Sequence, residues 1–189
     1  MGNQSKRSKQ ASVIRVFRKL HRVTASALFV LFFIMAATGV LLGLKKHSGE
    51  LIQDKTYQGT SSNLQDWLPI DSLYDRAYMV FRDSIALDCP VEIDRIDIRA
   101  EKGTVKFTSA QGFWGVQIDG ATGKLLHVER RRSDFIEMIH DGSLVDHYLG
   151  IPNGMFKLIY TLVMGLALLL FTITGFWLWW GPKRMRRNK

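Results

Sequence analysis

Two long apolar runs dominate the pattern of hydrophobic and polar positions along the chain. Val23 to Leu44 and Leu158 to Trp180 contain no charged residue. A helix of about twenty residues rises about 1.5 Å per residue and so spans a hydrocarbon core of about 30 Å. The pattern therefore predicts an integral membrane α-helical hairpin, with transmembrane helices at 23–44 and 157–180 in the lipid bilayer.

The charges predict how this hairpin is oriented. All 17 acidic residues lie between the two apolar runs. In the terminal segments 1–22 and 181–189, the charged residues are all Lys or Arg. Basic flanks stay on the cytoplasmic side during insertion. We expect a bacterial plasma (inner) membrane protein with both termini cytoplasmic and residues 45–156 periplasmic or extracellular. The net charge of +9 arises beside the spans, where it attracts anionic headgroups, and does not indicate nucleic-acid binding.

A cleaved secretory signal is the competing interpretation of the first run. The apolar region of such a signal is about 7 to 15 residues long and ends at a small-residue cleavage site. This run instead continues past Ala36 and Ala37 to Leu44. The length favours a retained anchor.

Between the runs, the periodicity of the chain changes twice. Residues 45–68 are rich in small polar residues and have little periodicity, which is typical of a connector. Apolar residues then recur at a spacing of three and four, which predicts an amphipathic helix that ends before Cys89 and Pro90. Its apolar positions are Ile70, Leu73, Ala77, Val80 and Phe81.

Beyond Pro90 the apolar residues alternate, which predicts several antiparallel strands. The alternation slips by one between Ile93 and Ile96, which predicts a β-bulge. Turn-forming residues at 101–103, 110–112 and 119–124 separate the strands. We expect an exported α+β domain, a helix plus an antiparallel sheet, at 69–129. A membrane-proximal segment at 130–156 follows it.

Cys89 is the only cysteine, so the exported domain has no internal disulfide and depends on its own core. We expect its side chain to pack as a small apolar group.

The hairpin Val116 to Leu126 ends a helix-and-strand region and reads VQIDGATGKLL, which resembles the last hairpin of a PepSY domain. The residues around the two spans fit the same resemblance. The first apolar helix is preceded by Arg18-Lys19-Leu20-His21-Arg22 and contains Thr38-Gly39. The second is preceded by Ile139-His140-Asp141-Gly142 and contains Thr174-Gly175. These motifs resemble the PepSY-associated transmembrane family, from about Arg15 to Trp180. The resemblance implies a PepSY fold for 69–129 and makes the protein a small two-helix member with a single PepSY domain.

Larger members of that family have more helices and include haem-containing reductases that release iron from ferric siderophores. A b-type haem needs two axial ligands, usually histidines. The candidate ligands are His21, at the inner end of the first span, His140, ahead of the second span, and His47, past the outer end of the first. His21 has no partner on the inner side, so a haem there requires a homodimer or another subunit.

On the outer side, His47 pairs with His140 or His147 in the haem interpretation. On one continuous helix His140 and His147 lie about 10 Å apart, so sharing an iron requires a helix break near Gly142. The simpler interpretation is that histidines at helix ends anchor in the headgroup layer by hydrogen bonds.

Two further features suggest partners. Arg130, Arg131 and Arg132 are either a solvated hinge or a contact for an anionic group, such as a siderophore carboxylate or a phospholipid. Gly39 and Gly43 form a G-x-x-x-G face that favours helix pairing, within the chain or in a homodimer. The Thr-Gly pair recurs near the end of each span, which indicates a weak repeat.

Two functional hypotheses follow. The first is a membrane-anchored PepSY-domain protein that acts as an accessory, binding or regulatory component of the cell envelope, with a partner protein or a role in iron-siderophore uptake. The alternative is a small haem-b electron-transfer protein of a ferric-siderophore reductase system, hence an oxidoreductase. The first ranks ahead because no matched ligand pair lies within the membrane. We expect no catalytic residue and no metal other than haem iron.

Overall fold

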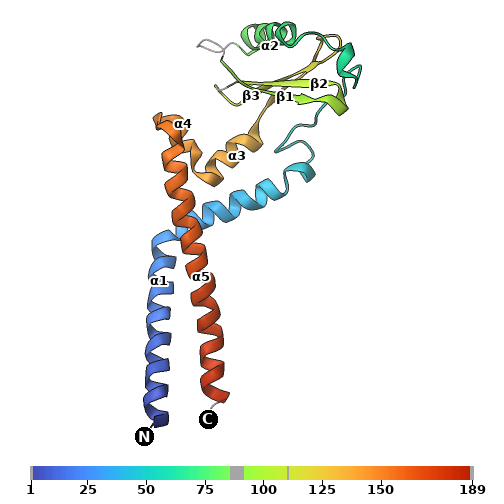
Figure 1. The fold of residues 1–189 in the computed structure, drawn as a ribbon. Coiled ribbons are helices and arrows are strands. Elements are labelled where there is room, and N and C mark those ends of the chain that lie inside the picture. Colours follow the sequence, from blue (N-terminus) through green and yellow to red (C-terminus); the bar gives the residue numbers. More distant parts are fainter. Residues whose placement is uncertain (1, 86–91, 110, 188–189) are drawn as a thin grey trace. The chain divides into compact units, whose positions relative to one another are not determined.

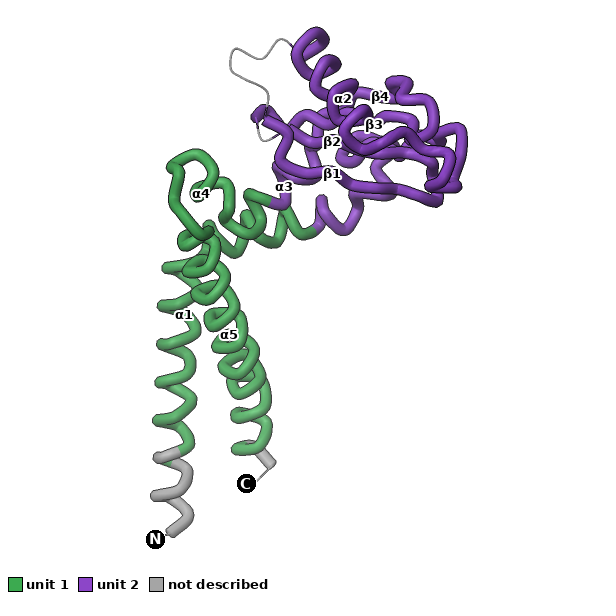
Figure 2. Tube along the Cα trace, turned by 45° about the horizontal axis from the view of Figure 1, so that its top comes forward, with its two compact units in different colours: residues 1–39, 138–189 green, residues 40–137 purple. Residues whose placement is uncertain are grey.

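The computed structural model describes the backbone of residues 2–85, 92–109 and 111–187, which form two compact units (Figure 2). Unit 1 comprises residues 1–39 and 138–189, and unit 2 comprises residues 40–137. Cys89 lies outside the described residues, so its apolar packing stays a prediction.

Two long helices form most of unit 1 (Figure 1). Helix α1 is Gly2–Gly43, and helix α5 is Met155–Arg187. They pack antiparallel, because Phe17 near the start of α1 contacts Trp177 near the end of α5, with ring centroids 6.1 Å apart. The predicted apolar runs lie within these helices, except that Leu44 falls one residue past the end of α1. The helices extend further than the runs, since nothing in the Lys- and Arg-rich start of the chain breaks a helix.

The segments Gln10–Gly43 and Pro152–Met185 are long and apolar enough to cross a membrane. In the most apolar stretch of each, only 6% and 11% of the residues are buried within the protein. A core helix of a soluble protein buries its apolar side chains instead. The exposed apolar surface of α1 and α5 is therefore suited to contact with lipid.

The membrane-proximal segment is helical. Helix α3 (Arg132–Asp141) and helix α4 (Ser143–Leu149) are separated by Gly142, which has a φ of +82°. A Cβ atom at position 142 would lie 3.0 Å from the ring of Tyr160 on α5. Glycine thus permits both the turn and the close contact. A short 3₁₀ turn, Pro152–Gly154, then leads into α5.

Unit 2 contains a four-stranded antiparallel sheet in the order β1-β2-β3-β4. The strands are β1 (Ile93–Arg99), β2 (Thr104–Ser109), β3 (Trp114–Asp119) and β4 (Leu125–Arg130). The register between β1 and β2 shifts between Ile93 and Arg95, which confirms the predicted β-bulge. The predicted turns at 101–103 and 119–124 are also present, and residue 110 of the third turn is outside the described residues.

Helix α2 (Ile70–Ser84) packs on one face of this sheet, as its apolar spacing predicts. It covers β2 and β3, whose side chains form the core with those of the helix. The fully buried members are Leu73, Ala77, Phe81, Val105, Phe107, Val116 and Ile118. Ile70, predicted on the apolar face, is the first residue of the helix and is 47% exposed.

The other face of the sheet is covered by residues 54–61, which we call the strap. The side chain of Gln117 accepts a hydrogen bond from the Tyr57 amide at 2.9 Å and donates one to the Lys55 carbonyl at 2.9 Å. The amide of Gly59 donates to the Lys102 carbonyl at 2.7 Å. The segment predicted as a connector therefore contributes to the folded domain, because its irregular backbone finds hydrogen-bond partners on the sheet.

Candidate functional site

Within unit 1, two histidines each pair with the threonine of a Thr-Gly sequence on a distant helix segment. Nδ1 of His140, on α3, lies 2.9 Å from Oγ1 of Thr38 on α1. Nδ1 of His21, on α1, lies 2.8 Å from Oγ1 of Thr174 on α5. Both threonines are buried, at 8% and 2% exposure. We call these two contacts the His–Thr pairs.

The threonine hydroxyls determine which histidine nitrogen carries the proton. Oγ1 of Thr38 donates to the Ile34 carbonyl at 2.7 Å, and Oγ1 of Thr174 donates to the Leu170 carbonyl at 2.7 Å. A hydroxyl has one proton, so each oxygen accepts from the histidine. This geometry assigns an Nδ1–H tautomer to His21 and His140. Their Nε2 atoms have no hydrogen-bond partner among the described residues, and in the neutral ring they carry the lone pair.

The glycine after each threonine borders the imidazole ring. A Cβ atom at Gly39 would lie 3.4 Å from Cε1 of His140, and one at Gly175 would lie 4.0 Å from Cε1 of His21. Gly39, predicted to pair with another helix, thus packs against His140 of the same chain. Gly43 has no atom within 4 Å of an added Cβ. Homodimerisation through the two glycines stays a prediction.

The two His–Thr pairs lie near opposite ends of the helical pair. Asp141, next to His140, forms an ion pair with Lys157 at the start of α5, with 2.5 Å between Nζ and Oδ2. Thr174 follows 17 residues later on the same helix, about 25 Å along its axis. That separation is far more than two ligands of one iron can span. His21 and His140 of one molecule therefore cannot share a haem.

The acidic residues that precede α5 support its first turn. Burial opposes ionisation of Asp141, but hydrogen bonds from Lys157 and Ser143 outweigh it and lower the pKa of this carboxyl. Asp146 accepts hydrogen bonds from the amides of Phe156 and Lys157 at 2.9 and 2.8 Å. Carboxylates favour the N-terminus of a helix because of its unpaired amides and dipole. These contacts fix the segment that carries His140.

The remaining histidines lie elsewhere in the fold. His147 is on α4, beyond the break at Gly142 that the sequence interpretation required. His47 is in the 3₁₀ turn Lys45–His47 and belongs to unit 2, whereas His140 belongs to unit 1. His127, on β4, contacts Asp54 with 3.4 Å between Nε2 and Oδ2. The role of His47 as a haem ligand stays a prediction.

The three consecutive arginines have separate partners within unit 2. The guanidinium of Arg130 lies 5.3 Å from the Trp114 ring centroid. Arg131 donates to Asp134 at 2.7 Å and to the Ser109 carbonyl at 2.8 Å. Arg132 donates to the Leu51 carbonyl at 3.1 Å. Their first role is therefore to fix the end of β4, and a contact with lipid or an anionic partner stays a prediction.

An uncovered apolar strip lies along the first strand of the sheet. Ile96 and Ile98 pair with Phe107 and Val105 and so lie on the face that α2 covers, yet they are 39% and 56% exposed. Tyr74 of α2 borders Phe107 with 6.3 Å between ring centroids and is 37% exposed. We call Tyr74, Ile96 and Ile98 the β1 strip. The strip lies on an edge strand, because among the described residues β1 pairs only with β2.

No protein-family model matches the chain, and a search of curated proteins finds no significant match. Membership of the PepSY-associated family and the haem and siderophore roles that it implies therefore stay predictions. What the structure establishes is two long apolar helices and a separate domain with a four-stranded antiparallel sheet.

Sequence reasoning named both histidines but missed their partners. The recurring Thr-Gly pair was the available signal, since a buried hydroxyl beside a glycine offers a hydrogen bond and space for a ring. The β1 strip was missed as well. Alternation shows that Ile96 and Ile98 share a face with the core, but it does not show where a covering helix ends.

Proposed function

We propose that this protein is a membrane-anchored binding module whose exported sheet domain captures an extended segment of an envelope protein along β1. The observation that carries the proposal is the β1 strip on an edge strand. An edge strand presents unpaired N–H and C=O groups, which pair readily with another extended chain. Such strand addition derives affinity from main-chain hydrogen bonds and specificity from alternate side chains.

The chemistry of β1 defines the occupant. Ile96 and Ile98 favour a segment with apolar side chains at alternate positions. On the opposite side of the strand, Arg95 contacts Asp97 at 3.3 Å and Asp134 at 3.5 Å, so these charges are already partly satisfied within the domain. An uncharged or alternating apolar and polar segment suits this edge better than a strongly charged one. Membrane anchoring by α1 and α5 places such capture at the membrane surface.

Site-specific photo-crosslinking in cells tests this proposal. A photoreactive amino acid at Ile98 is expected to give one discrete adduct, whose partner mass spectrometry identifies. The control places the same group at Leu64, which is 56% exposed in the 3₁₀ turn Leu64–Asp66 outside the sheet. We expect no adduct there, and we expect Ile96→Lys to remove the Ile98 adduct.

Binding by the purified partner provides the decisive measurement. Full-length protein in detergent should bind it, Ile98→Lys should weaken binding at least tenfold, and Leu64→Lys should have little effect. Equal crosslinking from both positions, or binding that Ile98→Lys does not change, contradicts the proposal. An adduct between two copies of this chain assigns the edge to self-association instead.

The His–Thr pairs favour a second candidate, the haem-b carrier. A histidine whose Nδ1–H is held by a hydrogen bond presents Nε2 in a fixed orientation, which is how proteins orient histidine ligands of metals. His21 and His140 have this geometry, so they would hold the haem, and His21 needs a second axial ligand from another molecule. A bound haem would supply one-electron transfer across the membrane. A link to siderophore iron rests on the family resemblance alone.

The absorbance of protein purified from haem-replete cells tests this candidate. A Soret band is expected at one haem per two chains for each bis-histidine site that a dimer shares, and so at one haem per chain if both sites are filled. His140→Ala or His21→Ala should remove the haem held at that position, whereas His127→Ala should not. A colourless preparation that stays colourless after added haemin contradicts the candidate. So does full haem retention when both His21 and His140 are replaced.

A further inference from the structure

The basic ends of α1 and α5 border a partly open apolar cavity of about 150 Å³ within unit 1. Val13 and Ile14 line it from α1, and Trp177, Trp180 and Gly181 line it from α5. Its polar surface is a small fraction of its lining. An apolar space of about this volume accepts a hydrocarbon group of about the size of benzene. It is therefore suited to part of an acyl chain and not to a polar metabolite.

Gly181 keeps this cavity open. A Cβ atom at position 181 would lie 3.3 Å from the side chain of Ile14, which is 8% exposed. A larger side chain here would therefore displace Ile14 or fill the space between the helices.

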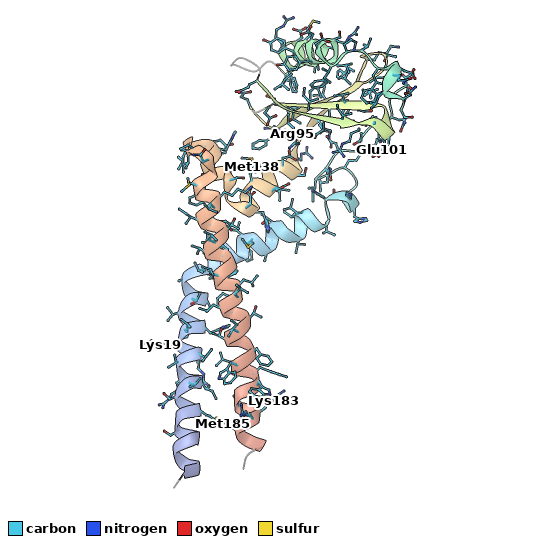
Figure 3. All side chains as sticks on the ribbon, in the orientation of Figure 1. Lys19, Arg95, Glu101, Met138, Lys183 and Met185 are labelled. Carbon is cyan, nitrogen blue, oxygen red and sulfur yellow. The ribbon has the colours of Figure 1, made fainter. Side chains whose placement is uncertain are left out.

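A cation completes the lining of the cavity. Arg184 is one of the lining residues, and its guanidinium lies 5.0 Å from the Trp180 ring centroid, where the cation–π contact positions it. Lys183, its neighbour near the end of α5 (Figure 3), lies instead over Trp179, 3.8 Å from the ring centroid. The chain contains no acidic residue before Glu50 or after Asp146, so neither helix end offers an Asp or Glu side chain to neutralise Arg184.

We propose that this cavity binds one anionic phospholipid, with part of an acyl chain between α1 and α5 and the phosphate on Arg184. An apolar cavity with a cation at one side matches an amphiphile with a charged head, and a guanidinium binds phosphate through two parallel hydrogen bonds. Tryptophans and cations together mark the depth of the headgroups. The proposal rests on membrane anchoring and is independent of peptide capture at β1.

Tryptophan quenching by brominated lipids tests the proposal with the full chain in vesicles. Trp179 is 59% exposed and any surrounding lipid would quench it, so the experiment uses the Trp179→Phe background. Trp177 and Trp180 then report the cavity, and Trp67 and Trp114 of unit 2 give a constant signal. The vesicles contain phosphatidylcholine and phosphatidylglycerol in equal amounts, with bromine on the acyl chains of one or the other.

Brominated phosphatidylglycerol is expected to occupy the cavity about fivefold more often than brominated phosphatidylcholine, the preference that one basic residue near the surface provides. Arg184→Gln should reduce this ratio to near one. Lys183→Gln is the matched control, since it removes the same charge one residue away without touching the cavity, and should preserve most of the ratio. Val13→Phe should lower quenching by filling the cavity.

Equal quenching by the two lipids overturns the proposal. Equal losses from Arg184→Gln and Lys183→Gln also overturn it, because they indicate general attraction of anionic lipid to a basic helix end. Val13 is 40% exposed, so its replacement is compatible with folding, and unchanged quenching in Val13→Phe places the lipid outside the cavity.

Discussion

The Nδ1 atom of His140 lies 2.9 Å from the hydroxyl oxygen of Thr38, although 102 residues separate them in the sequence. The equivalent contact of His21 with Thr174 joins residues 153 apart. Each His–Thr pair connects one apolar helix to a segment from the other end of the chain. The two contacts thus tie the helical unit together near both of its ends.

Replacing Thr38 with valine keeps the shape of the side chain and removes the hydroxyl. We expect Thr38→Val and Thr174→Val each to destabilise the helical unit by about 1 kcal/mol, because a buried hydrogen bond is lost and a histidine N–H is left without its partner. Unfolding in a denaturing detergent, followed by circular dichroism, measures the change.

Thr172→Val is the matched control for both threonine variants. Its hydroxyl also donates to the carbonyl four residues earlier, at 2.9 Å from Leu168, but the side chain is exposed and contacts no histidine. We expect little change in stability. A loss equal to that of Thr174→Val would show that the intrahelical bond matters and the histidine does not.

Enlarging Gly39 should displace His140. A Cβ atom there lies at 3.4 Å from the ring, so Gly39→Ala should be nearly tolerated. Gly39→Leu forces the ring away and should cost about 1–3 kcal/mol, which is typical of overpacking. Gly43→Leu is the control, since nothing lies within 4 Å of its added Cβ. The midpoint of thermal unfolding in detergent ranks the three variants.

The same series distinguishes internal packing from a dimer. If two copies pair through the G-x-x-x-G face, Gly43→Leu should destabilise the protein as much as Gly39→Leu and should change the oligomeric state. Light scattering of the detergent-solubilised variants measures that state.

The stability of unit 2 should depend on pH through the ionisation of Asp119. Burial opposes ionisation of this carboxyl, but hydrogen bonds from Thr60, Thr122 and backbone amides outweigh it and lower its pKa to about 2. A carboxyl with a depressed folded-state pKa stabilises the domain above its unfolded pKa of about 4. That contribution is lost as pH falls from about 4 to about 2.

The lost contribution amounts to about 2 kcal/mol after allowance for solvent screening. Urea unfolding followed by tryptophan fluorescence at pH 5, 4, 3 and 2 measures it. Asp119→Asn should be less stable at pH 5 and should flatten the dependence in this range. If the slope of stability against pH is unchanged in Asp119→Asn and is lost in the exposed Asp71→Asn, the pH dependence arises from a residue other than Asp119.

Removing one member of the buried ion pair in unit 2 should be costly. Nζ of Lys106 lies 2.5 Å from Oε1 of Glu129, and their side chains are 12% and 4% exposed. Lys106→Met leaves the Glu129 carboxylate buried without its counter-ion and should cost about 3 kcal/mol. Adding Glu129→Gln should restore part of the loss, because the unpaired charge is then absent. Urea unfolding measures both variants.

Lys55→Met provides the comparison for Lys106→Met. Lys55 pairs with Glu50 at 3.1 Å, but their side chains are 58% and 43% exposed. A solvent-exposed pair contributes little, so this variant should be far more stable than Lys106→Met. Similar losses in the two variants would contradict the assignment of a buried, costly charge.

Much of the fold could be predicted from local patterns. The spacing of Leu73, Ala77 and Phe81 places α2, and the slip between Ile93 and Ile96 places the bulge of β1. Such features depend on which side chains share a face within one element, and the period of the chain records that directly. The strap was not predictable in this way. Its residues have no period, and their hydrogen bonds go to strands about sixty residues away.

The sequence by itself determined the two apolar helices, the strands and the histidines that are candidates for function. Only the tertiary structure decided what these elements contact. It pairs Thr38 with His140, gives three adjacent arginines separate partners, and leaves Ile96 and Ile98 partly exposed. The physical reason is that an element forms from interactions a few residues apart. The partner of a polar side chain and the reach of a covering helix depend instead on how distant segments pack.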